Sequence, residues 1–307
     1  MGEETMDLAA DQAVEAILRD ELAREARALS AVVPVLRHLL GSEAQALLSE
    51  AILARVRGMI GDLAAQLVAA EAGHDPATRA VGMDPLAAEA LAETLTGDAE
   101  LLAHCHALAA ESLAAERLHQ RHAIDPVLSP LLQELIASED TAVAALAMAA
   151  LAAQSRFVQG QRRMELPLGE LPAELFHTLL ARLPEGPGRA GLVAAYDEGA
   201  SRLGLMARLV ASLRRGVVAA LALDHAGLAM FASALAVTTP TPRGAAVLAC
   251  HEGQGMRFAL LLRAAGLAPP AIERQLLLVE PAGRPPRMLA AVSPERAAAL
   301  LGGEQAG

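Results

Sequence analysis

Two Glu-x-x-His sequences are the residues of this chain that are best spaced to bind metal ions. Glu116 and His119 form the first, and Glu174 and His177 form the second on a separate predicted helix. A three-residue spacing places both side chains on one helix face, as in di-iron and di-manganese carboxylate bundles. Such a centre also needs a Glu from each of two further helices, and no pattern selects them. Alternatively, Glu174 complements a helix dipole in the first turn of its helix without any metal.

The predicted helix that carries the first pair holds further metal-capable side chains. His104, Glu111, His119 and His122 project onto one stripe of this helix. At a rise of about 1.5 Å per residue, His104 lies roughly 27 Å from His122, so these two cannot share an ion. A solvent-exposed or partner-facing helix surface explains the same stripe without a metal.

Arg162 and Arg163, followed by Glu165, form a second candidate site. Paired guanidiniums can bind an acidic partner protein or a phosphate. A solvated hinge is equally consistent with this sequence. We therefore predict Arg162 and Arg163 as partner-binding residues, with the hinge as the alternative.

Other patterns that could carry chemistry are incomplete. Gly186, Gly188 and Gly191 spell Gly-x-Gly-x-x-Gly, but they follow a predicted helix instead of a strand, so a helix-helix loop is indicated. Asp224 and His225 lie in apolar surroundings, where a buried His satisfied by a hydrogen bond is expected. We predict no catalytic residue, and no cofactor apart from the metal alternative.

The composition predicts an all-α protein. Hydrophobic residues make up 54% of the 307 residues but aromatic residues only 2%, and the chain is dominated by Ala and Leu, which disturb a helix least. All 25 basic residues are Arg, so the Lys of phosphate loops, of pyridoxal enzymes and of protein kinases is missing. The net charge is −11 and the Arg residues are scattered among acidic ones, so no nucleic-acid partner is predicted.

The cysteines and the apolar segments indicate a cytoplasmic protein. Cys105 and Cys250 have no nearby Cys companion, so they read as buried thiols in a reducing compartment. The start of the chain is acidic, unlike a secretory signal. Residues 216–237 are about as long as a bilayer span, but Asp224 and His225 lie at the centre, so two short buried helices meeting there are predicted.

Proline, glycine and capping residues divide the chain into about a dozen helices, as in a multi-helix bundle or a short HEAT-like α-solenoid. The helix, acidic turn and helix over residues 129–161 resemble one HEAT-type repeat, with no convincing second copy. One long helix is predicted over residues 189–213. Residues 164–172, MELPLGELP, are the best candidate for a linker. We therefore expect two lobes, residues 1–163 and 173–307.

Two runs carry a resemblance to a known family. They are AQSRFVQGQRRMELPLGELPAELFHTLL, over residues 153–180, and RFALLLRAAGLAPPAIERQLLLVEP, over residues 257–281. In these runs the chain resembles the uncharacterised alphaproteobacterial helical proteins grouped as domain of unknown function twenty-three thirty-six. The resemblance covers roughly the C-terminal two thirds and implies a bacterial, all-helical protein. It brings no established activity and no site residues.

Three functions are compatible with these observations. The leading hypothesis is a non-enzymatic helical adaptor or regulatory module that binds a protein partner, since packed helices offer grooves to peptides. The second is a ferritin-like di-iron or di-manganese carboxylate protein that uses the two Glu-x-x-His motifs. The third is a carrier of an apolar ligand, suggested by the aromatic-poor core. The sequence predicts neither the partner nor the oligomeric state.

Overall fold

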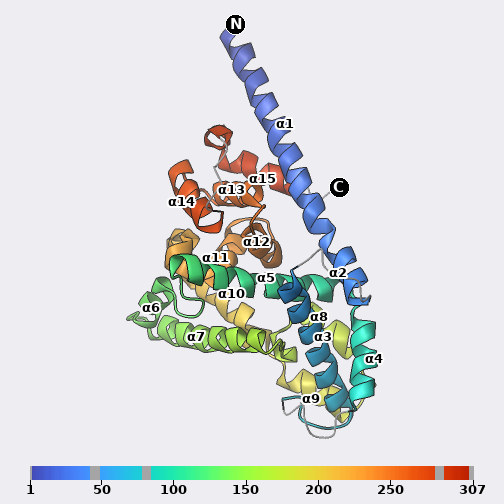
Figure 1. The fold of residues 1–307 in the computed structure, drawn as a ribbon. Coiled ribbons are helices and arrows are strands. Elements are labelled where there is room, and N and C mark those ends of the chain that lie inside the picture. The colour runs from blue at the N-terminus through green and yellow to red at the C-terminus, as the bar shows by residue number, and fades with distance from the viewer. Residues whose placement is uncertain (1, 42–48, 78–83, 281–286, 304–307) are drawn as a thin grey trace.

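The predicted all-α fold is confirmed. The computed structural model describes residues 2–41, 49–77, 84–280 and 287–303, and these residues form fifteen α-helices, four short 3-10 helices and no strand. The helices pack on one another as a multi-helix bundle (Figure 1). The α-helices are α1 (Gly2–Ser30), α2 (Val32–Gly41), α3 (Glu50–Glu71), α4 (Pro85–Leu95), α5 (Ala99–His122), α6 (Pro130–Ile136), α7 (Thr141–Arg162), α8 (Ala173–Leu180), α9 (Pro187–Ala195), α10 (Arg202–Ser212), α11 (Leu223–Thr238), α12 (Arg243–Ala249), α13 (Gly255–Ala264), α14 (Pro269–Val279) and α15 (Pro294–Gly303). The 3-10 helices are η1 (Leu168–Glu170), η2 (Glu198–Ala200), η3 (Arg214–Leu221) and η4 (Arg287–Ala291).

Short polar side chains begin the helices that frame the centre of the molecule. Asp98 accepts a hydrogen bond from the backbone N–H of Leu101 at the start of α5. Asp140 accepts from the N–H groups of Ala142 and Val143 at the start of α7. These bonds satisfy N–H groups that have no partner inside the helix. Both caps fix where the long helices begin.

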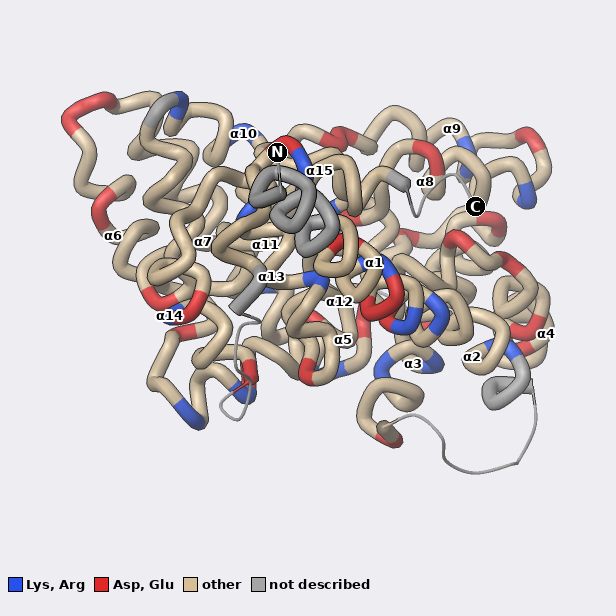
Figure 2. Tube along the Cα trace, turned by 90° about the horizontal axis from the view of Figure 1, so that it is seen from above, with Lys and Arg blue, Asp and Glu red and all other residues tan. Residues whose placement is uncertain are grey.

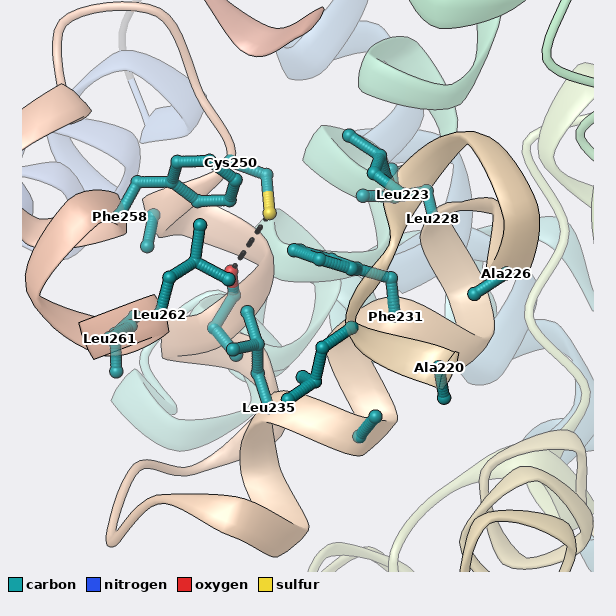
Figure 3. Close-up of a cluster of buried hydrophobic side chains, with 14 of the residues drawn as sticks. Ala220, Leu223, Ala226, Leu228, Phe231, Leu235, Cys250, Phe258, Leu261 and Leu262 are labelled. Atoms are coloured by element: carbon teal, nitrogen blue, oxygen red, sulfur yellow. Dashed lines mark hydrogen bonds between the residues drawn. The ribbon is translucent and has the colours of Figure 1, made fainter. Parts of the chain in front are cut away.

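Helix α5 runs between two hydrophobic cores and contacts α2, α3, α7, α11, α12 and α14. Its N-terminal half packs with α3 and α8 in the smaller core, where Leu63, Leu102 and Phe176 are buried. Its C-terminal half packs in the larger core with α7, α10, α11 and α13. In that core Phe231 and Phe258 lie with ring centroids 5.8 Å apart, beside Cys250 (Figure 3). Helix α5 is therefore the element around which the rest of the fold is arranged.

The packing does not follow the predicted division at residues 164–172. Each core takes buried residues from both sides of that segment. The segment itself is held against α3: the side chain of Gln66 donates to the carbonyl oxygen of Leu166 and accepts from the N–H of Leu168, both at 2.9 Å. Asp62 accepts from the N–H of Leu166 at 2.8 Å. Proline and glycine in this sequence therefore mark a packed connection.

The single helix predicted over residues 189–213 is wrong, because α9 and α10 are separate helices. Local hydrogen bonds make the break. Asp197 accepts from the N–H of Gly199 at 2.9 Å, and the hydroxyl of Ser201 accepts from the N–H of Gly204 at 3.1 Å. Such side-chain bonds to the backbone compete with helix continuation. As a result, α10 begins at Arg202 and directs this residue into the interior.

The sequence predicts two short buried helices that meet at Asp224 and His225, and the structure places the junction slightly earlier, at Ala222, between η3 and α11. Helix α11 begins at Leu223, so both residues lie in its first turn, Asp224 exposed and His225 half-buried. His225 Nε2 lies 3.4 Å from a carboxylate oxygen of Glu134. The interruption of α11 comes later, at Gly227, whose φ of 68° is a conformation that glycine adopts without steric cost.

Helix α7 is the one described helix that is long and apolar enough to cross a membrane by its length and composition. In the fold it packs against α6 and α10, with Ala147, Ala150 and Ala153 buried in the larger core. Only 22% of its apolar stretch is buried, and Met148 on this helix is 52% exposed. Elsewhere, acidic and basic residues are interspersed along the helices (Figure 2).

Helix α1 projects from the body at its N-terminal end and docks through its C-terminal half (Figure 1). Leu18 and Leu22 are buried in the larger core. Beyond them, the buried carboxylate of Glu25 accepts hydrogen bonds from the backbone N–H groups of Met256, at 3.0 Å, and Arg257, at 2.7 Å. Glu25 thereby caps α13 from a residue more than two hundred positions away in sequence.

This contact predicts a pH dependence of stability. Burial raises the pKa of Glu25 to about 7, although the two backbone hydrogen bonds and Arg257 oppose the shift and Glu21 adds to it. The folded protein therefore holds a proton that the unfolded chain has released, so the free energy of unfolding falls as the pH rises from about 4.5 to 7. We expect a loss on the order of 1–3 kcal/mol for this group.

Urea unfolding of wild type and Glu25→Gln at pH 5 and pH 8 measures that loss. The free energy of unfolding of wild type, relative to that of Glu25→Gln, should be lower at pH 8 than at pH 5. Asp20→Asn, on the exposed face of α1, should show no comparable change. A difference between wild type and Glu25→Gln that is the same at both pH values would contradict the assignment.

Candidate functional site

The centre of the molecule holds a buried carboxylate bound by two guanidiniums. Glu111 of α5 accepts from Arg202 of α10 at 2.7 and 2.9 Å, and from Arg243 of α12 at 2.7 and 2.8 Å. Glu111 is 1% exposed and Arg202 is 2% exposed. Each guanidinium bonds both carboxylate oxygens, which is the strongest geometry for this pair of groups. We call Glu111, Arg202 and Arg243 the ion cluster.

Neighbouring groups contact the two guanidiniums and accept hydrogen bonds from their remaining N–H groups. Arg202 also donates to the side-chain oxygen of Gln154 at 3.2 Å and lies 3.7 Å above the ring of Phe157. Arg243 donates to the hydroxyl of Ser233 at 2.9 Å and to a carbonyl oxygen of α11 at 3.2 Å. The ion cluster thus joins α5, α7, α10, α11 and α12 at one point.

The ion cluster determines the protonation states of Glu111 and of the nearby His104. Burial alone would raise the pKa of Glu111, but Arg202 and Arg243 outweigh burial and hold the pKa well below its usual range. His104 lies near them on the same stripe of α5, and its Nε2 is buried without a hydrogen-bond partner among the described residues. Burial, with the charges of Arg202 and Arg243, lowers the pKa of His104 to about 4. At neutral pH the site therefore contains an ionised Glu111 and a neutral His104.

A cavity of about 280 Å³ opens beside the ion cluster. The cavity is bounded by α5, the connection that follows it, α7 and α11. Its lining residues are Glu111, Ser112, Ala115, Glu116, His119, Gln120, Pro126, Gln154, Phe157, Val158, Arg162, Leu228 and Ala229. Residues at the bottom are buried, including Glu111, Gln154 and Leu228, whereas His119 and Arg162 are exposed. The cavity therefore has a buried floor and a charged, solvent-accessible mouth.

The first predicted metal pair, Glu116 and His119, lies on the wall of this cavity. Glu116 is held by Arg55 of α3, whose Nη2 donates to the carboxylate at 2.8 Å. The Arg55 side chain is 12% exposed and the Glu116 side chain 39% exposed. Glu116 therefore has a cationic partner from the protein itself, and His119 stands beside it at the mouth.

The second predicted pair, Glu174 and His177, is on α8, which packs in the smaller core. The ring of His177 contacts Phe176 and Tyr196, with centroids 5.4 and 6.1 Å away. Within the described ranges, no group of three or more His, Cys, Asp or Glu side chains is arranged to hold a metal ion. The fold does not bring the two Glu-x-x-His pairs together, and it offers the metal-carboxylate hypothesis no such centre.

The predicted pair of arginines is divided between two environments. Arg162, the last residue of α7, lines the cavity. Arg163, just beyond the helix, donates through Nε to Glu165 at 2.9 Å on the surface. Adjacent residues on a helix point about 100 degrees apart, so such a separation is expected at a helix end. Only Arg162 therefore belongs to the cavity.

Sequence reasoning missed the ion cluster itself. Arg202 is 91 residues from Glu111 and Arg243 is 132 residues from it, so no local spacing connects the three. One signal was present: Glu111 lies on an Ala- and Leu-rich helix whose neighbours three and four residues away are apolar. A carboxylate on a buried face requires a buried cation. That signal predicts a partner but does not identify it.

Comparisons with known proteins add no relative. Neither a protein-family model, nor a curated protein, nor a solved structure matches this chain. The resemblance to the alphaproteobacterial helical family therefore stays a prediction.

Proposed function

We propose that this protein is a non-enzymatic regulatory adaptor of the cytoplasm that binds a small ligand in the cavity beside the ion cluster and engages a protein partner according to whether the cavity is filled. The observation that carries the proposal is the cavity itself. Its volume of about 280 Å³ is just below the usual range for ligand sites, roughly 300–1,000 Å³, so the site suits a small molecule. Apolar groups and a few convergent polar groups share its lining, as in small-molecule sites.

The state of the reactive groups favours binding over catalysis. Both oxygens of Glu111 already accept hydrogen bonds from two arginines, which leaves this carboxylate poorly suited to take a proton from a substrate. Burial raises the pKa of Cys105 to about 12 and also raises that of Cys250, so neither supplies a thiolate nucleophile at neutral pH. Glu116 is engaged by Arg55. These groups therefore stabilise the fold around the cavity.

The position of the cavity favours a regulatory role. The helices that line it, α5, α7 and α11, are also joined to α10 and α12 through the ion cluster. A ligand that contacts several helices stabilises the arrangement in which they are packed around it. A partner that recognises that arrangement would then bind the loaded protein more tightly. This is the adaptor function predicted from the sequence, with a ligand as its control.

Filling the cavity tests the proposal. Ala115→Phe places a ring in the cavity from the half-buried wall of α5, and the available space should limit the change in the free energy of unfolding to about 1–3 kcal/mol. A small-molecule screen by thermal unfolding should find ligands that raise the Tm of wild type. The same ligands should leave the Tm of Ala115→Phe unchanged, because the site is occupied.

Ala145→Phe on the exposed face of α7 is the matched control, and it should respond to ligand like wild type. Native mass spectrometry of the protein from its own host should show a bound small molecule in wild type and none in Ala115→Phe. Equal ligand responses in wild type and Ala115→Phe would contradict the cavity as the binding site. A wild type that carries no ligand and responds to none would contradict the proposed function.

A further inference from the structure

The charged groups that line the cavity differ in whether they already have a partner in the protein. Glu111 and Glu116 both line it, and both are already paired with arginines of the protein. Arg162 also lines it, but makes no hydrogen bond or ion pair with any residue that the structure describes. The lining therefore presents two neutralised carboxylates and one guanidinium that is open for a ligand.

The surroundings of the cavity strengthen this imbalance. Arg55, Arg202 and Arg243 stand directly behind the two lining carboxylates, so guanidiniums outnumber carboxylates around the cavity. The protein as a whole carries a net charge of −11, so this balance is opposite to that of the chain. An excess of positive charge around a cavity favours an anionic ligand, because walls of low polarity concentrate the electric field inside the cavity.

The interior wall of the cavity is apolar in several places. Phe157 and Val158 of α7 face the site together with Leu228 and Ala229 of α11. These side chains lie deeper than Arg162, which is exposed at the mouth. Hydrocarbon groups on a ligand would leave water on entering this part of the site, which favours binding. The cavity thus suits a molecule with one charged end and one apolar end.

We propose that the cavity binds a small organic acid, with its carboxylate at Arg162 and its short hydrocarbon part among Phe157, Val158 and Leu228. This inference rests on the proposed function and names the class of its ligand. A single open guanidinium matches the charge and the planar shape of one carboxylate. A phosphate dianion would keep one of its two charges without an open guanidinium in the lining. An amine would face Arg162 without a counter-charge.

Four eight-carbon probes test the class: octanoate, octanol, octylamine and octyl phosphate, titrated into the full-length protein by calorimetry at pH 7.5. Octanoate should bind most tightly. Arg162→Gln should weaken octanoate binding by roughly tenfold, the effect of about one charge-assisted hydrogen bond, and leave octanol binding unchanged. Raising the salt concentration should weaken octanoate binding to wild type but not to Arg162→Gln.

Two variants serve as controls. Arg163→Gln removes the neighbouring guanidinium that pairs with Glu165 outside the cavity. Arg156→Gln removes an exposed guanidinium elsewhere on α7. Both should bind octanoate like wild type. These controls separate contact at Arg162 from a general change in surface charge.

The other outcomes separate this inference from the proposed function. Equal binding of octanoate and octanol, or unchanged octanoate binding in Arg162→Gln, would overturn the carboxylate assignment and leave a cavity that binds ligands. Preference for octylamine or octyl phosphate would do the same and would name a different class. Failure of all four probes would overturn the inference, and the proposed function would fall with it if native mass spectrometry also showed an empty protein.

Discussion

Replacing Glu111 with Gln should lower the free energy of unfolding by about 3–5 kcal/mol, the loss expected when one partner of a buried ion pair is removed. The substitution keeps the shape of the side chain but removes the charge that two guanidiniums share. The new side chain keeps one acceptor oxygen for two guanidiniums, so Arg202, 2% exposed, loses its charged partner and keeps Gln154 and the ring of Phe157 as its other close contacts. Equilibrium urea unfolding at neutral pH measures the difference.

Glu116→Gln is the matched control, since it makes the same chemical change five residues along α5. The pair between Glu116 and Arg55 is partly exposed, so its loss should lower the free energy of unfolding by about 0–1 kcal/mol. Losses of similar size in the two variants would contradict the assignment of the ion cluster as the central support of the cavity. The larger loss belongs to Glu111 because this carboxylate is buried and holds two guanidiniums, whereas the Glu116 side chain is 39% exposed and holds one.

Replacing Phe231 with Ala should be comparably destabilising, by about 3–5 kcal/mol. Phe231 is fully buried in the larger core, where its ring is tilted against that of Phe258 (Figure 3). Only four Phe residues and one Tyr occur in the chain, so the small side chains around this pair cannot readily fill the space left. Thermal and urea unfolding both report the loss.

Leu277→Ala on α14 is the control for removal of a large apolar side chain, because this residue is 46% exposed. We expect a change in the free energy of unfolding of about 0.5 kcal/mol. If Phe231→Ala were no more destabilising than Leu277→Ala, the larger core would not be packed around the aromatic pair. Phe258→Ala should repeat the result for Phe231, since each ring supports the other.

Local chemistry explains which parts of the fold the sequence predicts well. The caps at Asp98 and Asp140 depend on groups within three residues of each other, so their positions are readable from the chain. Helicity is readable for the same reason, because Ala and Leu favour helices wherever they occur. The break before Arg202 is also local, but Ala and Leu continue on both sides of it and conceal the capping role of Ser201.

The site depends on contacts that local patterns do not encode. The partners of Glu111 come from α10 and α12, and the cavity exists only because α7 and α11 pack beside α5. The sequence did single out Glu116, His119 and Arg162, and all three line the cavity. It grouped them with Glu174, His177 and Arg163, which do not line it. Tertiary packing therefore brings only some of the candidate residues to the cavity, and it places Arg202 and Arg243 beside them.

A crystal structure of the protein grown with octanoate shows whether the cavity binds a carboxylate. We expect electron density for octanoate in the cavity, with the carboxylate within hydrogen-bond distance of Arg162 and the hydrocarbon against Phe157 and Leu228. The ion cluster should be intact beside it, with Glu111 bonded to both arginines. Density for octanoate only at another surface, with water alone in the cavity at a saturating concentration, would show that the cavity is not the binding site.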